Sequence, residues 1–124
     1  MTIFINHTNH PSEKWSAAQR QAAEAFGEIV DVPFPAIPPE WDEHQVAKLA
    51  ASEAEELLAE HPAAVLVQGE FTYTYALIEH LRAAGIPALA ACSRREAVET
   101  VAPDGSTVRT STFRFLRFRR YGTA

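Results

Sequence analysis

The chain has 124 residues, of which 47% are hydrophobic and 22% are charged, and its formal net charge is −5. That length fits one domain with a hydrophobic core, so we expect residues 1–124 to form a single domain. No run approaches the roughly 18 consecutive apolar residues of a membrane span, and the N-terminus lacks the basic and apolar regions of a signal peptide. We therefore expect a cytoplasmic protein that contacts no membrane.

In chain order, hydrophobic periodicity and capping signals predict a strand at Thr2–Asn6, a helix from Ser12 or Ser16 to Phe26, a strand at Glu28–Val32, a proline-rich loop, a helix at Glu43–Glu60, a strand at Ala63–Gln68, a helix at Phe71–Ala84 and a strand at Ile86–Cys92. Such alternation is typical of an α/β, Rossmann-like fold with a parallel sheet of about four strands flanked by helices.

The pattern changes after Arg95. Ala97–Val101 and Thr107–Phe118 read as strands joined by the turn signal Pro-Asp-Gly at 103–105. The phenylalanines of the second strand alternate imperfectly with arginines, which indicates a β-bulge near Leu116. We therefore expect a C-terminal antiparallel β-hairpin appended to the parallel sheet.

Charge is distributed unevenly along the chain. Residues 1–70 hold 12 acidic and 3 basic residues, a net of −9, whereas residues 71–124 hold 8 arginines and 4 acidic residues, a net of +4. Arginine makes planar, two-pronged contacts with phosphate, and the negative total disfavours general attraction to nucleic acid. We expect a small anionic ligand and no duplex DNA, although the arginines from 114 to 120 equally fit a solvated edge strand protected by charge.

Parallel α/β sheets bind ligands at the carboxyl ends of their strands. Three predicted segments lie there, and they contain Asn6, His7, Thr8, Asn9 and His10, then Gln68, Gly69, Glu70 and Thr72, and finally Ser93, Arg94 and Arg95. The phosphate-binding patterns GxxxxGK[ST] and GxGxxG are absent from the second segment. Helix amides after Gly69, with the two arginines nearby, nevertheless suit a phosphate.

Several of these groups have more than one interpretation. His7 or His10 could transfer a proton near neutral pH or merely cap a neighbouring element, and without a third ligand we expect no metal and no cofactor. Glu70 would repel a phosphate, so it either caps the following helix or contacts a base or ribose. Either Tyr73 or Tyr75 could stack on a purine, but core packing of at least one is favoured. Cys92 fits a small buried residue better than a nucleophile.

The run VQGEFTYTYALIEHLRAAGIPALAACSRR and the ending TSTFRFLRFRRY resemble small stand-alone CRISPR-associated proteins with a Rossmann-like CARF domain, found beside type III systems. The resemblance covers the second half of the chain by sequence and the first half by topology. It implies a homodimer that binds a cyclic oligoadenylate second messenger, expected to be cyclic tetra-adenylate, across its two-fold axis.

Some such proteins are ring nucleases that end type III CRISPR antiviral signalling. The resemblance thus implies metal-independent attack of a ribose 2′-hydroxyl on the adjacent phosphorus, leaving a 2′,3′-cyclic phosphate. In that role His7 or His10 would transfer the proton and Arg94 would contact phosphate. The ligand-binding residues would be Asn6, Thr8, Asn9, Gln68, Gly69, Glu70, Thr72, Ser93 and Arg95. Two alternatives remain, a non-catalytic sponge for the messenger and an unrelated Rossmann-like nucleotide-binding module.

Overall fold

The computed structural model describes residues 2–123 and contains one five-stranded sheet with the order β2-β1-β3-β4-β5. The strands are β1 (Ile3–Thr8), β2 (Glu28–Asp31), β3 (Ala64–Gln68), β4 (Ala88–Val101) and β5 (Thr107–Arg120). The first four are parallel and β5 is antiparallel to β4. The α/β prediction, with a parallel core and a C-terminal antiparallel pair, is therefore confirmed, but the sheet has five strands rather than four.

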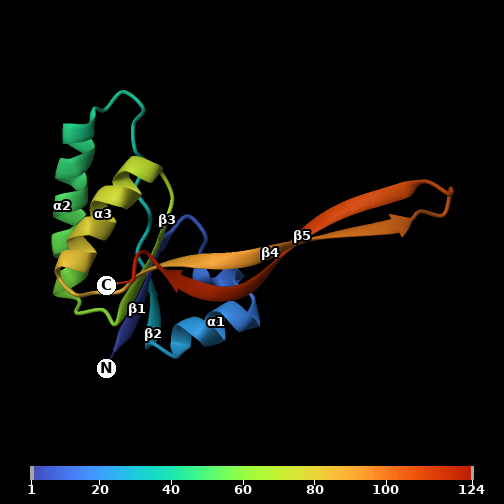
Figure 1. The fold of residues 1–124 in the computed structure, drawn as a ribbon, viewed down its shortest axis with the longest axis horizontal. Coiled ribbons are helices and arrows are strands. Elements are labelled where there is room, and N and C mark those ends of the chain that lie inside the picture. Colours follow the sequence, from blue (N-terminus) through green and yellow to red (C-terminus); the bar gives the residue numbers. More distant parts are fainter. Residues whose placement is uncertain (1, 124) are drawn as a thin grey trace.

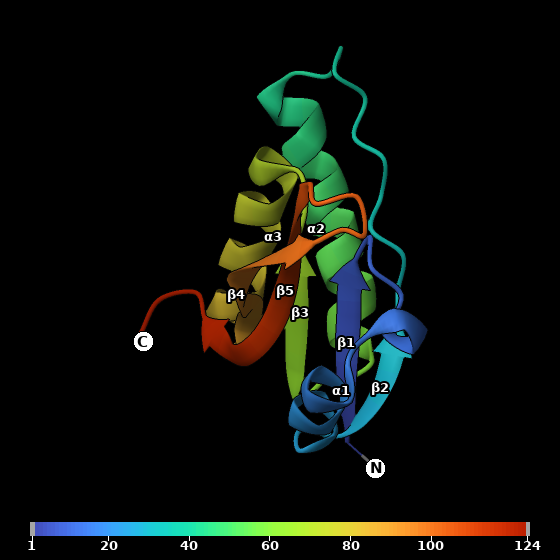
Figure 2. The same cartoon turned by 90° about the vertical axis from the view of Figure 1, so that its right-hand side faces the viewer.

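Helices cover both faces of the sheet (Figures 1 and 2). The short 3₁₀ turn η1 (Ser12–Lys14) and α1 (Ala17–Glu24) lie on one face, and α2 (Glu43–Ala59) and α3 (Phe71–Ala83) lie on the other. Strand residues alternate between two cores, so that Phe4 and Leu66 pack on the α1 side while Ile5 and Val65 pack against α2 and α3. No helix within residues 2–123 is long and apolar enough to cross a membrane.

Helix boundaries follow the capping chemistry of the sequence. The Ser16 side chain accepts a hydrogen bond from the amide of Gln19 and starts α1, and Asp42 forms a capping box with Gln45 before α2. Gly85 takes a left-handed conformation, φ 76°, directly after α3. The predicted helix bounds therefore hold to within a few residues, except that Ser12 begins a separate 3₁₀ turn instead of α1.

Strand β1 is longer than predicted. The sequence predicts that this strand ends at Asn6, but the polar residues His7 and Thr8 continue it and pair with Val67 and Gln68 in the parallel ladder. Both side chains are buried and hydrogen-bonded within the fold, which is why a polar sequence continues as a strand here.

Strand β4 is one continuous strand of 14 residues, whereas the sequence predicted two strands separated by charged residues. It pairs with β3 only at Ala88 and Leu89, and beyond these residues its backbone partner is β5 alone. Residues 94–114, which we call the arm, project from the body on the side of the sheet that carries α1 (Figures 1 and 2). The charged residues do not break the strand because both faces of the arm are in solvent.

The predicted bulge lies at Leu116. Cys92 pairs with Arg117 and Ser93 pairs with Phe115, so Leu116 is an extra residue in β5. One extra residue returns Phe115 and Phe118 to the same face, where their ring centroids lie 5.0 Å apart. The bulge therefore explains why the phenylalanines alternate imperfectly in the sequence.

Candidate ligand-binding pocket

A pocket of about 700 Å³ opens on the α1 side of the sheet, at the carboxyl ends of β1 and β3. After β1 the chain passes to α1 on one face, and after β3 it passes to α3 on the opposite face. Adjacent strands whose connections leave in opposite directions create a crevice, which is the usual ligand site of an open α/β sheet. The pocket is lined by Thr8, Asn9, His10, Pro11, Lys14, Trp15, Ser16, Gln19, Leu66, Gln68, Gly69, Ala91, Ser93, Phe113 and Phe115.

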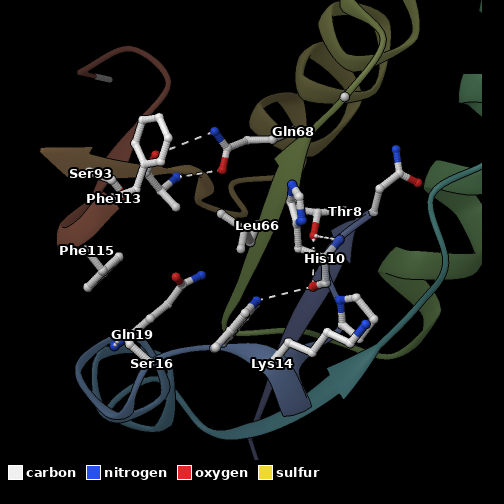
Figure 3. Close-up of a pocket in the computed structure, with 15 residues that line it drawn as sticks. Thr8, His10, Lys14, Ser16, Gln19, Leu66, Gln68, Ser93, Phe113 and Phe115 are labelled. Atoms are coloured by element: carbon white, nitrogen blue, oxygen red, sulfur yellow. Dashed lines mark hydrogen bonds between the residues drawn. The ribbon is translucent and has the colours of Figure 1, made fainter. Parts of the chain in front are cut away.

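Two walls of different chemistry face each other across Leu66 (Figure 3). One wall is the loop after β1 with the start of α1, and it supplies His10, Lys14 and Gln19. The other wall is the base of the arm. It supplies Ser93, Phe113 and Phe115, while Trp15 adds a third aromatic ring to the lining. Aromatic faces beside hydrogen-bonding and cationic groups suit a flat, anionic ligand.

A buried network shapes the wall after β1. The side-chain amide of Asn6 donates to the carbonyl oxygen of His10 at 2.9 Å and to Asp31 Oδ1 at 3.0 Å. Thr8 Oγ1 donates to Asn6 Oδ1 at 2.8 Å, and the Trp15 indole donates to the same His10 carbonyl at 3.2 Å. Asn6 was predicted to bind ligand, but it is 2% exposed and is committed to this network. Its role is to hold the loop that presents His10.

Gln68 holds the opposite wall. Its side-chain Oε1 accepts from the amide of Ala91 at 2.9 Å, and Nε2 reaches the Ala91 carbonyl at 3.5 Å (Figure 3). The side chain thus replaces the backbone ladder where β3 and β4 separate. Tyr121 does the same one residue earlier, because its hydroxyl donates to the Val67 carbonyl at 2.8 Å. The separated strands open the floor of the pocket without leaving these buried backbone groups unpaired.

His7 lies on the other face of the sheet from the pocket. It is fully buried, with Nδ1 2.8 Å from the Val32 carbonyl and Nε2 2.7 Å from the Tyr73 hydroxyl. Because a carbonyl only accepts, Nδ1 carries the proton and Nε2 accepts from Tyr73. Burial lowers the pKa of His7, and its hydrogen bond to Val32 offsets only part of that effect. The placement of His7 among the catalytic candidates is therefore corrected, since its neutral ring joins structural elements and does not reach the pocket.

The carboxylate of Glu70 binds at the start of α3, where the sequence suggests a phosphate. Its carboxylate accepts from the amide of Tyr73 at 2.7 Å and from Thr72 Oγ1 at 2.7 and 2.8 Å. The Tyr73 amide, followed by the Thr72 hydroxyl, lowers the pKa of this carboxyl. Of its two interpretations, capping of α3 is confirmed. The Tyr73 amide at the start of α3 therefore already binds an anion of the same chain, and a phosphate would have to displace the Glu70 carboxylate to reach it.

The predicted site residues of β4 lie on two different faces of the strand. Ser93 lines the pocket, whereas Arg94, its neighbour along the strand, lies on the opposite face. Arg95 returns to the Ser93 face but bonds Ser111 further out, with Nη2 3.0 Å from Ser111 Oγ. Neither arginine lines the pocket of its own chain.

The structure thus brings together half of the predicted site residues. The pocket is lined by Thr8, Asn9, His10, Gln68, Gly69 and Ser93, and it is not lined by Asn6, His7, Glu70, Thr72, Arg94 and Arg95. Tyr73 is buried and Tyr75 exposed, as expected for a pair with one core member, and Tyr75 does not line the pocket either. Cys92 is half-buried, and Arg119 Nε lies 3.0 Å from its sulfur.

Sequence reasoning missed six polar, charged or aromatic lining residues, namely Lys14, Trp15, Ser16, Gln19, Phe113 and Phe115. The first four follow β1 within a dozen residues and could have been found by extending the site to the next helix start. The phenylalanines lie far away in sequence and reach the pocket through β4–β5 pairing, which puts Phe115 directly opposite Ser93.

Among residues 2–123, no three histidine, cysteine, aspartate or glutamate side chains gather as a group that could hold a metal ion. The chemical groups that the pocket offers are therefore those described above: one imidazole, one ammonium, amides, hydroxyls and aromatic rings.

No curated protein is detectably similar to the chain. A family model described as the Uncharacterized protein MJ1673 family matches residues 2–119, which include every element of the pocket. Because that match spans nearly the whole chain, the protein belongs to the MJ1673 family.

Proposed function

We propose that the pocket binds a cyclic oligoadenylate, expected to be cyclic tetra-adenylate, in a Rossmann-like domain of the CARF type that works as a homodimer in type III CRISPR signalling. The observation that carries this proposal is the position of three aromatic residues beside hydrogen-bonding groups at the point where β1 and β3 diverge. That position is where α/β sheets bind nucleotides. The resemblance of the Val67–Arg95 segment supplies the class of nucleotide.

The lining suits the parts of such a ligand. Adenine bases stack on aromatic side chains, and each such stack contributes about 1–3 kcal/mol. Gln19 and Ser93 can each donate and accept hydrogen bonds, as recognition of a base edge requires. Lys14 places one positive charge on the wall opposite the phenylalanines, where a phosphate could lie.

Cleavage of the ring would rely on His10. Its carbonyl is held by Asn6 and Trp15, so the residue is fixed at the pocket wall. A neutral imidazole there can accept the proton of a ribose 2′-hydroxyl as the oxygen bonds to phosphorus. The 5′-oxygen leaves, takes up a proton, and the product ends in a 2′,3′-cyclic phosphate. Opening the ring in this way is a metal-independent transesterification, since no water is consumed.

Sequestration without cleavage is the second candidate. Two observations favour it: His7 is buried, and Arg94 does not line the pocket of its own chain. Of the three predicted catalytic residues, only His10 then lies at the pocket. A sponge needs affinity and no proton transfer, so the same lining serves it equally well.

The deciding experiment incubates the purified protein with cyclic tri-, tetra- and hexa-adenylate in EDTA, with separation of the products by chromatography. Linear products with 2′,3′-cyclic phosphate ends identify a ring nuclease and its substrate, and an intact ring that co-elutes with the protein identifies a sponge. If no ring is cleaved or retained, the proposal is wrong and the unrelated nucleotide-binding module takes its place.

Two variants locate the site. Phe113→Ala removes a lining ring that is 74% exposed, so the fold should tolerate it, and we expect affinity to fall about 5- to 150-fold, as for loss of one base stack. Phe71→Ala is the matched control, since Phe71 is 88% exposed on α3 and lies outside the pocket.

If the protein cleaves the ring, His10→Ala should lower the rate of cleavage about 100-fold or more while leaving binding near that of the wild type. The control His44→Ala should leave both the rate and the binding unchanged.

A further inference from the structure

The arm lacks the covering that a two-stranded ribbon normally needs. Within residues 94–114 every residue except Glu96 and Ala102 is exposed, and beyond Leu89 the backbone of β4 pairs only with β5. An isolated hairpin is at best marginally stable in water. Its two edges also carry unpaired backbone groups, which readily associate with another chain. The arm therefore has the features of a segment that becomes covered on assembly.

One face of the arm combines apolar and cationic side chains. Val98 and Val108 are diagonal neighbours on it, with exposed fractions of 46% and 44%. The same face carries Arg94 and Arg114, which are directly opposite each other in the ladder. Like charges in that arrangement destabilise a β-pair, and the nearby carboxylate of Glu96 lies 3.9 Å from Arg114 only. We call Arg94, Val98, Val108 and Arg114 the valine face.

Charge indicates what could cover this face. The arm contains four arginines and three acidic residues, a net of +1, while the chain as a whole is −5. The remainder of the chain is therefore −6. A second copy of the same chain accordingly offers an acidic body to a basic arm, and steering of this kind favours association of the two.

The pocket is also short of positive charge. Its lining contains Lys14 and the imidazole of His10 but no arginine, whereas a cyclic oligoadenylate carries one negative charge for each nucleotide. Arg94 and Arg114 lie on the arm, and neither lines the pocket of its own chain.

We propose that the arm docks through its valine face on a second copy of this chain and that Arg94 and Arg114 complete the partner's pocket. The docking concerns the chain alone, while the role in the pocket rests on the proposed function. Stable interfaces bury about 1,600 Å² in total and use about 20–30 residues a side. Two exchanged arms of 21 residues each are of that size.

The first test measures mass by size-exclusion chromatography with light scattering, without ligand, at about 10 μM protein. The wild type should be a dimer, and Val98→Glu/Val108→Glu should be a monomer. The control Ala97→Glu/Thr107→Glu adds the same two charges to the opposite face of the arm and should remain a dimer. A third variant replaces residues 96–112 by Asn-Gly between the paired residues Arg95 and Phe113, leaves the core and pocket intact, and should be a monomer.

A wild-type monomer at 100 μM would overturn the docking, and so would an arm-less variant that still dimerises. Either result leaves ligand binding by the isolated pocket measurable, so failure of the docking and failure of the proposed function are distinguishable.

The second test asks whether the arm acts on the partner's pocket. Arg94→Ala/Arg114→Ala subunits have a defective arm and an intact pocket, and Lys14→Ala/Gln19→Ala subunits, whose changes lie outside the arm, have the reverse. Each alone should bind radiolabelled cyclic tetra-adenylate at least tenfold more weakly than the wild type. Co-expressed mixed dimers should regain one tight site per dimer if the arm acts in trans. No recovery, with dimers intact, would overturn the assignment of these arginines to the partner's pocket.

Discussion

His7 joins three parts of the chain through one neutral ring. It bonds the Val32 carbonyl at the start of the proline-rich loop and the Tyr73 hydroxyl on α3, and it packs against Phe34 with ring centroids 5.5 Å apart. Gly69 packs closely against the Phe34 ring, because a Cβ atom there would come within 2.3–2.6 Å of it. Removal of a buried hydrogen-bonding group costs about 1–3 kcal/mol when its partner stays unpaired.

We predict that this ring makes stability depend on pH. The pKa of His7 in the folded chain lies below its ordinary value of 6.5, so the unfolded chain binds the proton more readily. Stability from this residue is complete above pH 6.5 and is lost as the pH falls from there toward the folded pKa. Thermal unfolding between pH 7.5 and 5 should show this decline in the wild type and in the exposed control His44→Ala.

His7→Gln should be less stable at pH 7.5 by about 1–3 kcal/mol but should lose less on acidification. If the variant and the wild type decline in parallel, His7 is not the group responsible.

At the scale of single elements, α3 begins on a carboxylate of its own chain. Glu70 caps the helix through the Tyr73 amide, in place of the Ser, Thr, Asp or Asn usual at that position. The cap thereby occupies the Tyr73 amide, which would otherwise be open to an anionic ligand.

We expect Glu70→Ala to lower the free energy of unfolding by about 1 kcal/mol, the usual cost of a lost cap, which for a domain of this size is about 3–6 °C in Tm. Glu70→Asp is the control, because a shorter carboxylate is itself a favoured cap and should restore most of the loss. Equal Tm values for Glu70→Ala and the wild type, measured by calorimetry, would show that the cap contributes nothing.

At the scale of the whole molecule, the body and the arm differ in how they are stabilised. The body has a core on each face of the sheet, whereas the arm is exposed on both faces. Local stability follows the burial of apolar contacts, so hydrogen exchange should distinguish the two regions.

We predict that amides of residues 96–112 exchange fast in the monomeric Val98→Glu/Val108→Glu variant and are protected in the wild-type dimer, while β1 and β3 exchange equally slowly in both. The comparison uses mass-spectrometric hydrogen exchange at matched concentration. Equal exchange of the arm in the two proteins would mean that nothing covers it in solution.

The sequence by itself determined the alternation of strands and helices, the helix caps and even the bulge at Leu116, because periodicity, capping and turn residues act over a few neighbours. It also pointed to the edge of the sheet at which the pocket lies. The tertiary structure decided which polar residues are free to meet a ligand. Asn6, His7 and Glu70 have the chemistry of site residues, yet each is committed to partners within the chain, while Phe113 and Phe115 reach the pocket from a distant segment. Such commitments depend on pairs of residues up to 66 positions apart in the chain, and local sequence patterns carry no information about them.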